Sequence, residues 1–234
     1  MTLHGPSLGI GAGITAAAIM IAFFAFDNII NEKELILENA EDIQATSQKI
    51  GLEVFTKNGS PYLGDPNAPI TLVEFGDYQC FFCNKYFHDT EHDILTNFVE
   101  TGKVKIIFKD YTIIGPDSVT AAHAAHCAND QGMFWEYHDI LYNNWAGENN
   151  GWASSGNLLQ FAQDIELDID NFSECMLNEL HTSIITNSNS DAQTLGLTGT
   201  PAFFVIGSDN QVTKISGAQP YEVFKGIFDS ELKK

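Results

Sequence analysis

The chain has 234 residues and a formal net charge of −20 at pH 7, because 31 acidic residues face only 11 basic ones, all of them lysine. An acidic chain without a basic cluster does not replace the counterions of nucleic acid, so we exclude a nucleic-acid-binding protein. Hydrophobic residues make up 44% and aromatic residues 12% of the chain. This composition is sufficient for one sizeable globular core.

An uncharged apolar run extends from Ser7 to Phe26. A helix of this length spans a bilayer at about 1.5 Å of rise per residue. The segment from Ala22 to Asp27 has no well-placed pair of small residues for signal-peptidase cleavage. We therefore expect residues 1–26 to form an uncleaved signal-anchor, a single transmembrane helix, with a secretory signal as the alternative.

The orientation of this anchor is not given by its flanks, because almost no positive charge borders the apolar run. We expect the rest of the chain to lie outside the cell membrane, since the chain has four cysteines and disulfides persist there. Residues 27–63 are mostly polar, with isoleucine and leucine at roughly helical spacing. They predict a juxtamembrane helix or tether.

The main domain begins after turn-forming residues between Asn58 and Pro69. Apolar runs predict strands, and apolar residues at helical spacing predict helices. The elements expected first are a buried strand at Ile70–Phe75, a helix at Cys80–Val99 and a strand at Val104–Ile114.

Helical patterns fill the next part of the chain. They cover Ser118–Ala128, Phe134–Trp145, Leu158–Ala162, a helix capped at Asp170–Ser173 that runs to Leu180, and Ile184–Leu195. The chain then closes with strands at Ala202–Ile206 and Val212–Ile215 and a helix at Tyr221–Leu232. This order predicts an α/β domain built from residues 64–115 and 196–234, with a helical insertion at residues 116–195.

Two cysteines, Cys80 and Cys83, lie where the first strand gives way to a helix. Cysteines three residues apart on the first helical turn are close enough to form a disulfide. The unpaired N–H groups and the dipole at a helix N-terminus favour the thiolate, which is the reactive form in disulfide exchange. The pattern indicates a redox site, although zinc sites use the same cysteine spacing.

Four motifs in the same order carry a family resemblance. They are GDPNAPITLVEFGDYQCFFCNKY at 64–86, AAHCANDQGMFWEYHDILY at 124–142, LGLTGTPAFFVIG at 195–207 and ISGAQPYEVF at 215–224. The chain resembles the DsbA-like thiol–disulfide oxidoreductases of the thioredoxin superfamily, and most of all their membrane-anchored or secreted branch. This resemblance implies a thioredoxin-like fold with a helical domain inserted in the sheet.

The resemblance also implies roles for single residues. Cys80 would be the exposed attacking cysteine, and Cys83 the buried partner that resolves or leaves as a thiolate. Glu74, on the strand beneath the helix, would exchange a proton with Cys83, because burial raises a carboxyl pKa. A hydrogen-bonded strand glutamate without this role is the alternative. Thr200-Pro201 would be a cis peptide facing the cysteines, with the Thr200 backbone able to pair with an extended substrate; a trans proline at a strand start is the alternative.

The residues between the cysteines depart from the best-known members, because Phe81-Phe82 replaces Pro-His. A phenylalanine cannot stabilise the Cys80 thiolate as histidine does, so we expect a higher Cys80 pKa and a less oxidising disulfide. The two rings add an apolar surface for unfolded chains.

The other two cysteines, Cys127 and Cys175, fall in the helical insertion. Similar pairs form a structural disulfide in some relatives, which would stabilise the fold by roughly 3–4 kcal/mol. Two buried free thiols, or a pair that regulates Cys80 and Cys83, are the alternatives. His123 and His126 lie beside Cys127, but no fourth ligand is evident, so we expect no metal site.

These observations predict an extracytoplasmic enzyme that introduces disulfides into exported proteins. The expected clients are reduced exported proteins, and the family resemblance implies a quinone-linked membrane partner that would re-oxidise Cys80 and Cys83. No cofactor is expected, since no glycine-rich phosphate loop or haem-attachment motif is present. The alternatives are a disulfide isomerase or reductase, and a membrane-anchored binding or chaperone module in which the redox chemistry is incidental.

Overall fold

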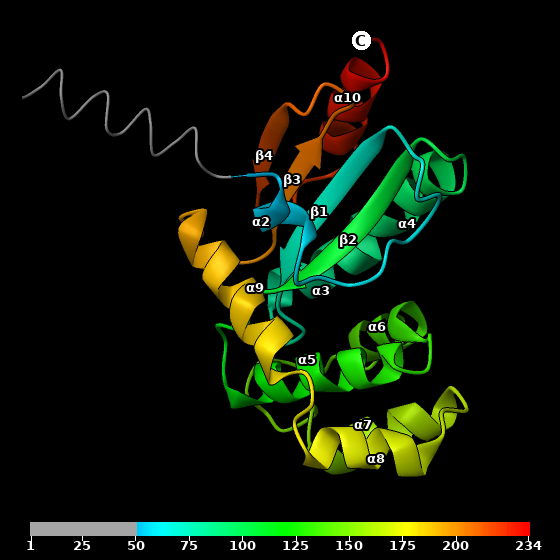
Figure 1. The fold of residues 1–234 in the computed structure, drawn as a ribbon, viewed down its shortest axis with the longest axis vertical. Helices are drawn as coiled ribbons and strands as arrows, with labels where there is room; N and C mark the ends of the chain where they lie inside the picture. The colour runs from blue at the N-terminus through cyan, green and yellow to red at the C-terminus, as the bar shows by residue number, and fades with distance from the viewer. Residues whose placement is uncertain (1–50) are drawn as a thin grey trace, which may run out of the picture. The chain divides into compact units, whose positions relative to one another are not determined.

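A computed structural model describes residues 51–234 of the chain (Figure 1). The predicted signal-anchor at 1–26 and most of the predicted tether at 27–63 lie outside these residues. Among residues 51–234, no helix has both the length and the apolar character to cross a membrane.

A four-stranded sheet forms the centre of the domain, in the order β2-β1-β3-β4. Its strands are β1 (Ile70–Gly76), β2 (Val104–Asp110), β3 (Ala202–Ile206) and β4 (Val212–Ser216). β1 and β2 are parallel, whereas β3 is antiparallel to both of its neighbours, β1 and β4. β1, β2 and β3 read as nearly continuous apolar runs because helices cover both faces of the sheet.

One face of the sheet packs against the long helical segment that follows β1 and against α10 (Tyr221–Glu231). The long segment consists of α3 (Phe81–Tyr86), the π-helical turn η1 (Phe87–Glu91), α4 (His92–Ile94) and a second π-helical turn, η2 (Leu95–Val99). The other face packs against the short α2 (Glu53–Thr56) and α9 (Thr182–Thr194).

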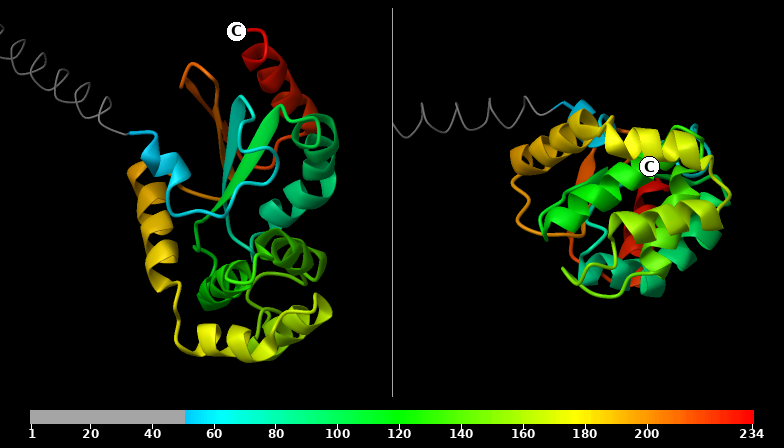
Figure 2. Two further views of the ribbon diagram at one scale, coloured as in Figure 1. Left: turned by 45° about the vertical axis from the view of Figure 1, so that its right-hand side comes forward. Right: turned by 90° about the horizontal axis from the view of Figure 1, so that it is seen from below.

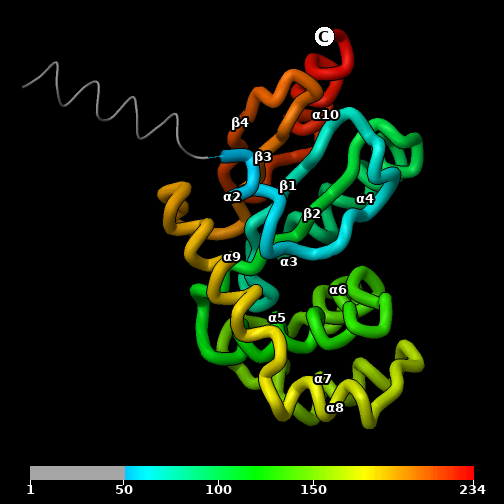
Figure 3. The backbone as a smooth tube through the Cα atoms, viewed as in Figure 1, coloured from blue at the N-terminus to red at the C-terminus, as the bar shows by residue number. Residues whose placement is uncertain are grey.

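The insertion between β2 and β3 forms a helical layer at one end of the sheet (Figures 1 and 2). It contains α5 (Pro116–Asn129), α6 (Phe134–Asn143), α7 (Ser155–Asp164) and α8 (Ile169–Leu177). α9 then leads the chain back to the sheet, as the backbone trace in Figure 3 shows. The element order is therefore the predicted one, a sheet whose two halves flank a helical insertion.

Predicted boundaries are wrong in two elements, β2 and α8. β2 ends at Asp110, four residues before the predicted end at Ile114, because Ile113 and Ile114 donate their N–H groups to the Asp77 carboxylate and so leave the sheet. The α8 helix begins after Asp168, whose side chain accepts the N–H of Asn171, and not at the predicted cap at Asp170–Ser173. This helix also ends earlier, at Leu177, because Asn178 closes it.

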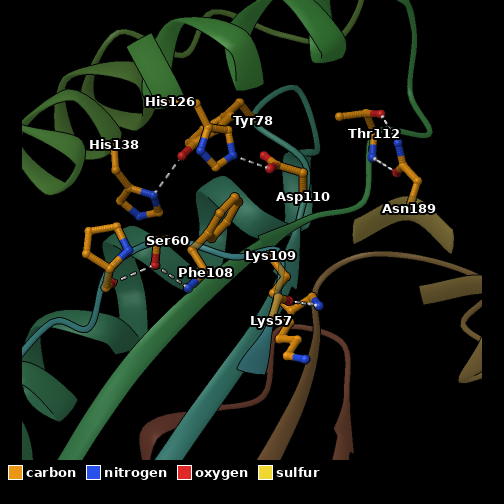
Figure 4. A network of polar contacts seen from close by, with 11 residues as sticks. Lys57, Ser60, Tyr78, Phe108, Lys109, Asp110, Thr112, His126, His138 and Asn189 are labelled. Carbon is orange, nitrogen blue, oxygen red and sulfur yellow. Dashed lines mark hydrogen bonds and ion pairs between the residues drawn. The ribbon is translucent and has the colours of Figure 1, made fainter. Parts of the chain in front are cut away.

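Buried polar contacts join the sheet to its surroundings (Figure 4). The Lys109 ammonium is fully buried and donates to the Val54 carbonyl at 2.8 Å and to the Asp191 carboxylate at 2.6 Å. Asp110 pairs with His126 on α5 at 2.7 Å, and the Tyr78 hydroxyl lies 3.1 Å from His138 Nδ1 on α6. These pairs fix α2, α9 and the insertion to β2 and to the loop after β1.

Candidate active site

The loop before the first cysteine is held by a buried carboxylate. Asp77 accepts the N–H of Gln79 at 2.9 Å with one oxygen, and its other oxygen accepts the N–H of Ile113 and Ile114 at 2.8 and 3.0 Å. Cys80 donates its own N–H to the Asp77 carbonyl. These bonds place Cys80 as the N-cap of α3, in extended backbone, immediately before the first helical turn.

The Cys80 sulfur lies where α3 presents its unpaired N–H groups. A hydrogen bond from the Cys83 thiol is the largest cause that lowers the Cys80 pKa, to about 6, and the N–H groups of Cys83 and Phe82 lower it further. Burial opposes this effect, since only 4% of Cys80 is exposed. At neutral pH the thiolate of Cys80 is therefore the main form.

Cys83 lies one helical turn deeper and is fully buried. Burial is the largest cause that raises its pKa far above the ordinary value, and the Cys80 sulfur raises it further. The neighbouring cysteines thus differ sharply in acidity, as an attacking thiolate and a resolving thiol require. Cys80 and Cys83 are both free thiols in this structure.

Glu74 is on the β1 strand beneath the active-site helix and is 3% exposed. Its Oε1 atom has no hydrogen-bond partner among residues 51–234. Burial raises the Glu74 pKa well above its usual range, and the negative charges of Glu91 and Cys80 raise it further. The negative charge of an ionised Glu74 also raises the pKa of Cys83. Glu74 is therefore a buried, protonatable group beside the buried thiol.

The peptide bond between Thr200 and Pro201 is cis and lies opposite the cysteines. The Cys80 thiol lies 3.4 Å from the Thr200 carbonyl, to which it donates. A groove of about 180 Å³ runs beside this bond and is lined by residues 197–202, Lys214, Ser216 and Gly217. The structure thus brings together all five sequence-predicted site residues: Cys80, Cys83, Glu74, Thr200 and Pro201.

The two phenylalanines between the cysteines point away from the core. Phe81 is 49% and Phe82 56% exposed, and their rings are in edge contact at 5.3 Å. The Phe81 ring also lies 5.9 Å from the indole of Trp145. An apolar surface therefore borders Cys80 on its open side.

A loop of the insertion, residues 144–150, lies against the active site, although no pattern in the sequence indicates this contact. The Trp145 indole N–H donates to the Gln79 carbonyl at 2.8 Å, and the Asn149 N–H donates to the Gln79 side chain at 2.7 Å. The Glu148 carboxylate accepts the Phe81 N–H at 3.0 Å, next to Cys80. Contacts between residues more than 60 positions apart leave no periodic pattern, so sequence analysis missed Gln79 and Glu148.

Cys127 on α5 and Cys175 on α8 form a disulfide, with their Cα atoms 5.8 Å apart. This pair belongs to the helical layer and is not among the residues that surround Cys80. The donor atoms of Cys127, Cys175 and His181 lie within 4.8 Å of one another, but the two sulfurs are bonded to each other and are not thiolates. His123 and His126 are buried, and His126 pairs with Asp110.

Comparison with known proteins agrees with this geometry. The sequence model of the thioredoxin family matches residues 56–229. The chain belongs to this family.

Among curated relatives, a probable disulfide bond formation protein D of Bacillus cereus is 27% identical over 189 residues, which cover 79% of this chain and 84% of the relative. The Na(+)/H(+) antiporter NhaA 1 of Salinispora arenicola is 32% identical over 146 residues, which cover 62% of this chain and only 21% of the antiporter. Among solved structures, oxidised BdbD of Bacillus subtilis is 26% identical, with a TM-score of 0.68 and coverage of 79% of this chain and 96% of that one.

The fold, the cysteine pair and these relatives identify a DsbA-like thiol–disulfide oxidoreductase. The chemistry is carried by the sulfurs of Cys80 and Cys83 themselves.

Proposed function

We propose that this chain is a membrane-tethered dithiol oxidase that donates the Cys80–Cys83 disulfide to exported proteins. The observation that carries the proposal is the difference in acidity between Cys80, with a pKa of about 6, and the buried Cys83, with a raised pKa. A stabilised thiolate favours the reduced enzyme, and a stable reduced form makes the disulfide a better oxidant. The direction of exchange is then from enzyme to client.

In the first step, a client thiolate attacks Cys80 Sγ, a mixed disulfide forms and the Cys80–Cys83 bond breaks. Cys83 Sγ leaves with the electron pair, and Glu74 supplies the proton that neutralises it. In the second step, another client thiolate attacks the client sulfur of the mixed disulfide and releases Cys80 as a thiolate. The client is oxidised by two electrons and the enzyme is reduced by two.

The groove beside Thr200 and Pro201 suits an extended client segment. Backbone groups next to a cis X–Pro bond are available to pair with such a segment, in the manner of an added strand. The rings of Phe81 and Phe82 give a sequence-independent apolar contact on the other side of Cys80. We therefore propose reduced, unfolded exported proteins as clients and a membrane redox protein as the re-oxidant.

The apolar run at Ser7–Phe26 supports a membrane anchor, and the Cys127–Cys175 disulfide supports a location outside the cytoplasm. A membrane-impermeant maleimide tests this placement when it is added to intact cells after a membrane-impermeant reductant has opened the Cys80–Cys83 disulfide. Labelling of Cys80 in intact cells is the expected result. Labelling only after lysis would place the domain inside.

The equilibrium between the full chain and glutathione tests the direction of exchange. Samples of varied glutathione ratio are quenched with an alkylating agent, and the modified thiols are counted by mass. A Cys80–Cys83 disulfide that glutathione reduces readily supports the oxidase. If the Cys80–Cys83 disulfide stays formed at reducing glutathione ratios, the reductase or isomerase function is favoured over the oxidase function. A C80S/C83S variant that keeps its cellular effect would support the binding module instead.

A further inference from the structure

A second buried carboxyl lies in the layer between the sheet and the active-site helix. Glu91 closes the π-helical turn η1 and is 3% exposed. Its Oε2 atom, like Oε1 of Glu74, has no hydrogen-bond partner among residues 51–234. Neither carboxyl forms an ion pair within this part of the chain. Buried carboxyls without partners avoid charge by holding protons, so both are proton stores.

The fold places Glu74 between Cys83 and Glu91. The helical segment joins two parallel strands, so it runs antiparallel to β1. Glu91 lies eight residues beyond Cys83, which is about 12 Å along the helix at about 1.5 Å per residue. Glu74, two residues before the end of β1, faces this stretch of helix. π-helical turns inside α-helices are rare and are frequent at functional sites, and η1 is where Glu91 enters the buried layer.

The charges around these carboxyls follow the same order. Glu74 raises the pKa of Cys83, Glu91 raises that of Glu74, and Asp139 on α6 raises that of Glu91, after burial, to about 8. Asp139 is exposed, so the series ends at the surface. Other titratable groups face these carboxyls. Cys80, at the N-cap of α3, also raises the pKa of Glu74, and Glu136 on α6 raises that of Asp139 after burial. Burial first and then the charge of Glu74, among others, raise the pKa values of Tyr78, Tyr86 and Tyr142.

We propose that Glu91 is a positioning residue that acts through Glu74 and passes protons between Glu74 and the surface at Asp139. The proposal rests on the proposed function and adds a proton path between Cys83 and the surface that does not pass Cys80. When the Cys80–Cys83 bond breaks, Cys83 Sγ takes the proton of Glu74, and Glu74 takes the proton of Glu91. Asp139, in exchange with water, returns a proton to Glu91. A client seated on Phe81 and Phe82 covers the side of Cys80, so this rear path stays open during exchange.

The experiment compares the full chain with E91Q, E74Q and D93N. The Asp93 side chain is exposed on the same helical segment, so D93N makes the same charge change outside the buried layer. The oxidised enzyme is mixed with a synthetic peptide that has two reduced cysteines, in single turnover, from acidic to alkaline pH. The rate of disulfide loss is divided by the thiolate fraction of the peptide. The remaining pH profile reports the proton donated to Cys83.

We expect E91Q to lower the midpoint of this profile by about one pH unit, because the charge that raises the Glu74 pKa is gone. D93N keeps the midpoint of the unmodified chain, and E74Q abolishes the pH dependence. An infrared difference spectrum between oxidised and reduced enzyme provides a second readout. It should contain a protonated-carboxyl band that E91Q changes and D93N leaves in place.

The proposal is overturned if E91Q and D93N give the same midpoint and the same infrared band while E74Q alters both, because Glu74 then acts alone. A chain in which Cys80 and Cys83 never exchange with the peptide would overturn the proposed function itself. A change in melting temperature alone would not imitate the expected result, since a structural role moves stability and not the midpoint.

Discussion

The protein has two cysteine pairs that differ in sequence spacing and in the residues around them. Cys80 and Cys83 are separated by two residues at the start of one helix, beside a buried acid, and they differ strongly in pKa. Cys127 and Cys175 are 48 positions apart and join two helices of the insertion. The first pair is set up to exchange electrons, because neighbouring groups stabilise the Cys80 thiolate, the reactive form of the reduced state. The second is set up to close a long loop. The difference teaches that neighbouring groups, and not the cysteines, decide which disulfide reacts.

The largest expected effect is the loss of exchange when the first pair is broken. Replacing Cys80 with Ser removes the attacking sulfur, and we expect no oxidation of a dithiol peptide. Replacing Cys83 with Ser leaves the Cys80 thiolate able to attack the disulfide of an oxidised peptide, which opens that disulfide and forms a mixed disulfide with Cys80. Cys83 can then no longer attack Cys80 to release the peptide, so the mixed disulfide should accumulate. Non-reducing mass spectrometry measures both results. A C80S chain that still oxidises the peptide would contradict the assignment of the active pair.

Removal of the second pair should leave exchange intact and weaken the fold. In a C127A/C175A variant, we expect the free energy of unfolding to fall by roughly 3–4 kcal/mol, because the unfolded chain regains the freedom of a long loop. Urea unfolding measures this change, and the peptide-oxidation rate at low temperature provides the control. If the peptide-oxidation rate falls together with the free energy of unfolding, the two cysteine pairs are not independent.

The pH dependence of stability should reveal the buried acid behind the first pair. The Glu91 pKa is about 8 in the fold against an ordinary 4.5, so the folded state holds a proton that the unfolded state has lost. Its contribution to stability is full below pH 4.5 and is lost as the pH rises to about 8. The slope is about 1.4 kcal/mol per pH unit. Urea unfolding of E91Q across this range should show a slope that is smaller by this amount, because Glu74 still holds its own proton, and D93N should keep the full slope.

The smallest expected effect concerns the carboxylate at the start of the active-site helix. Glu148 accepts the Phe81 N–H beside the Cys80 thiolate, so the two negative charges repel. We expect E148Q to lower the Cys80 pKa below its value of about 6 by a few tenths of a unit, since Glu148 is exposed and screened by water. The pH dependence of iodoacetamide labelling measures the Cys80 pKa. The control is E100Q, the same substitution at the distant, exposed Glu100. An equal shift of the Cys80 pKa in E100Q would contradict a local effect of Glu148.

Much of this site could be predicted from sequence because its parts are close in the chain or carry a motif. Cys80 and Cys83 share one helical turn, and Glu74 stands on the strand before it. Thr200-Pro201 is distant in sequence, but the resemblance to DsbA-like proteins supplied it. The order of strands and helices also followed from the periodicity of apolar residues.

The contacts that sequence analysis missed depend on long-range packing. Gln79 and Glu91 read as ordinary polar residues, and only the folded chain shows both to be buried. The end of β2 was misplaced because the apolar Tyr111–Ile114 continues the strand pattern, while the capping carboxylate of Asp77 comes from another part of the chain. The expectation that Phe82 in place of histidine raises the Cys80 pKa compares this chain with family members that have the histidine, and it stays a prediction. In this chain the Cys83 thiol and the helical N–H groups bring that pKa to about 6.

Gln79 joins the loop of the insertion to the segment that leads into the active-site helix. Its backbone and side chain bind Trp145 and Asn149, so a loop of the insertion forms one wall of the entrance to Cys80. Mutations in residues 144–150 therefore alter the surface that a client meets, while Cys83 and Glu74 keep their surroundings in the sheet and its helix. Loop exchange can then engineer client preference, with the Cys80 pKa adjusted slightly through Glu148.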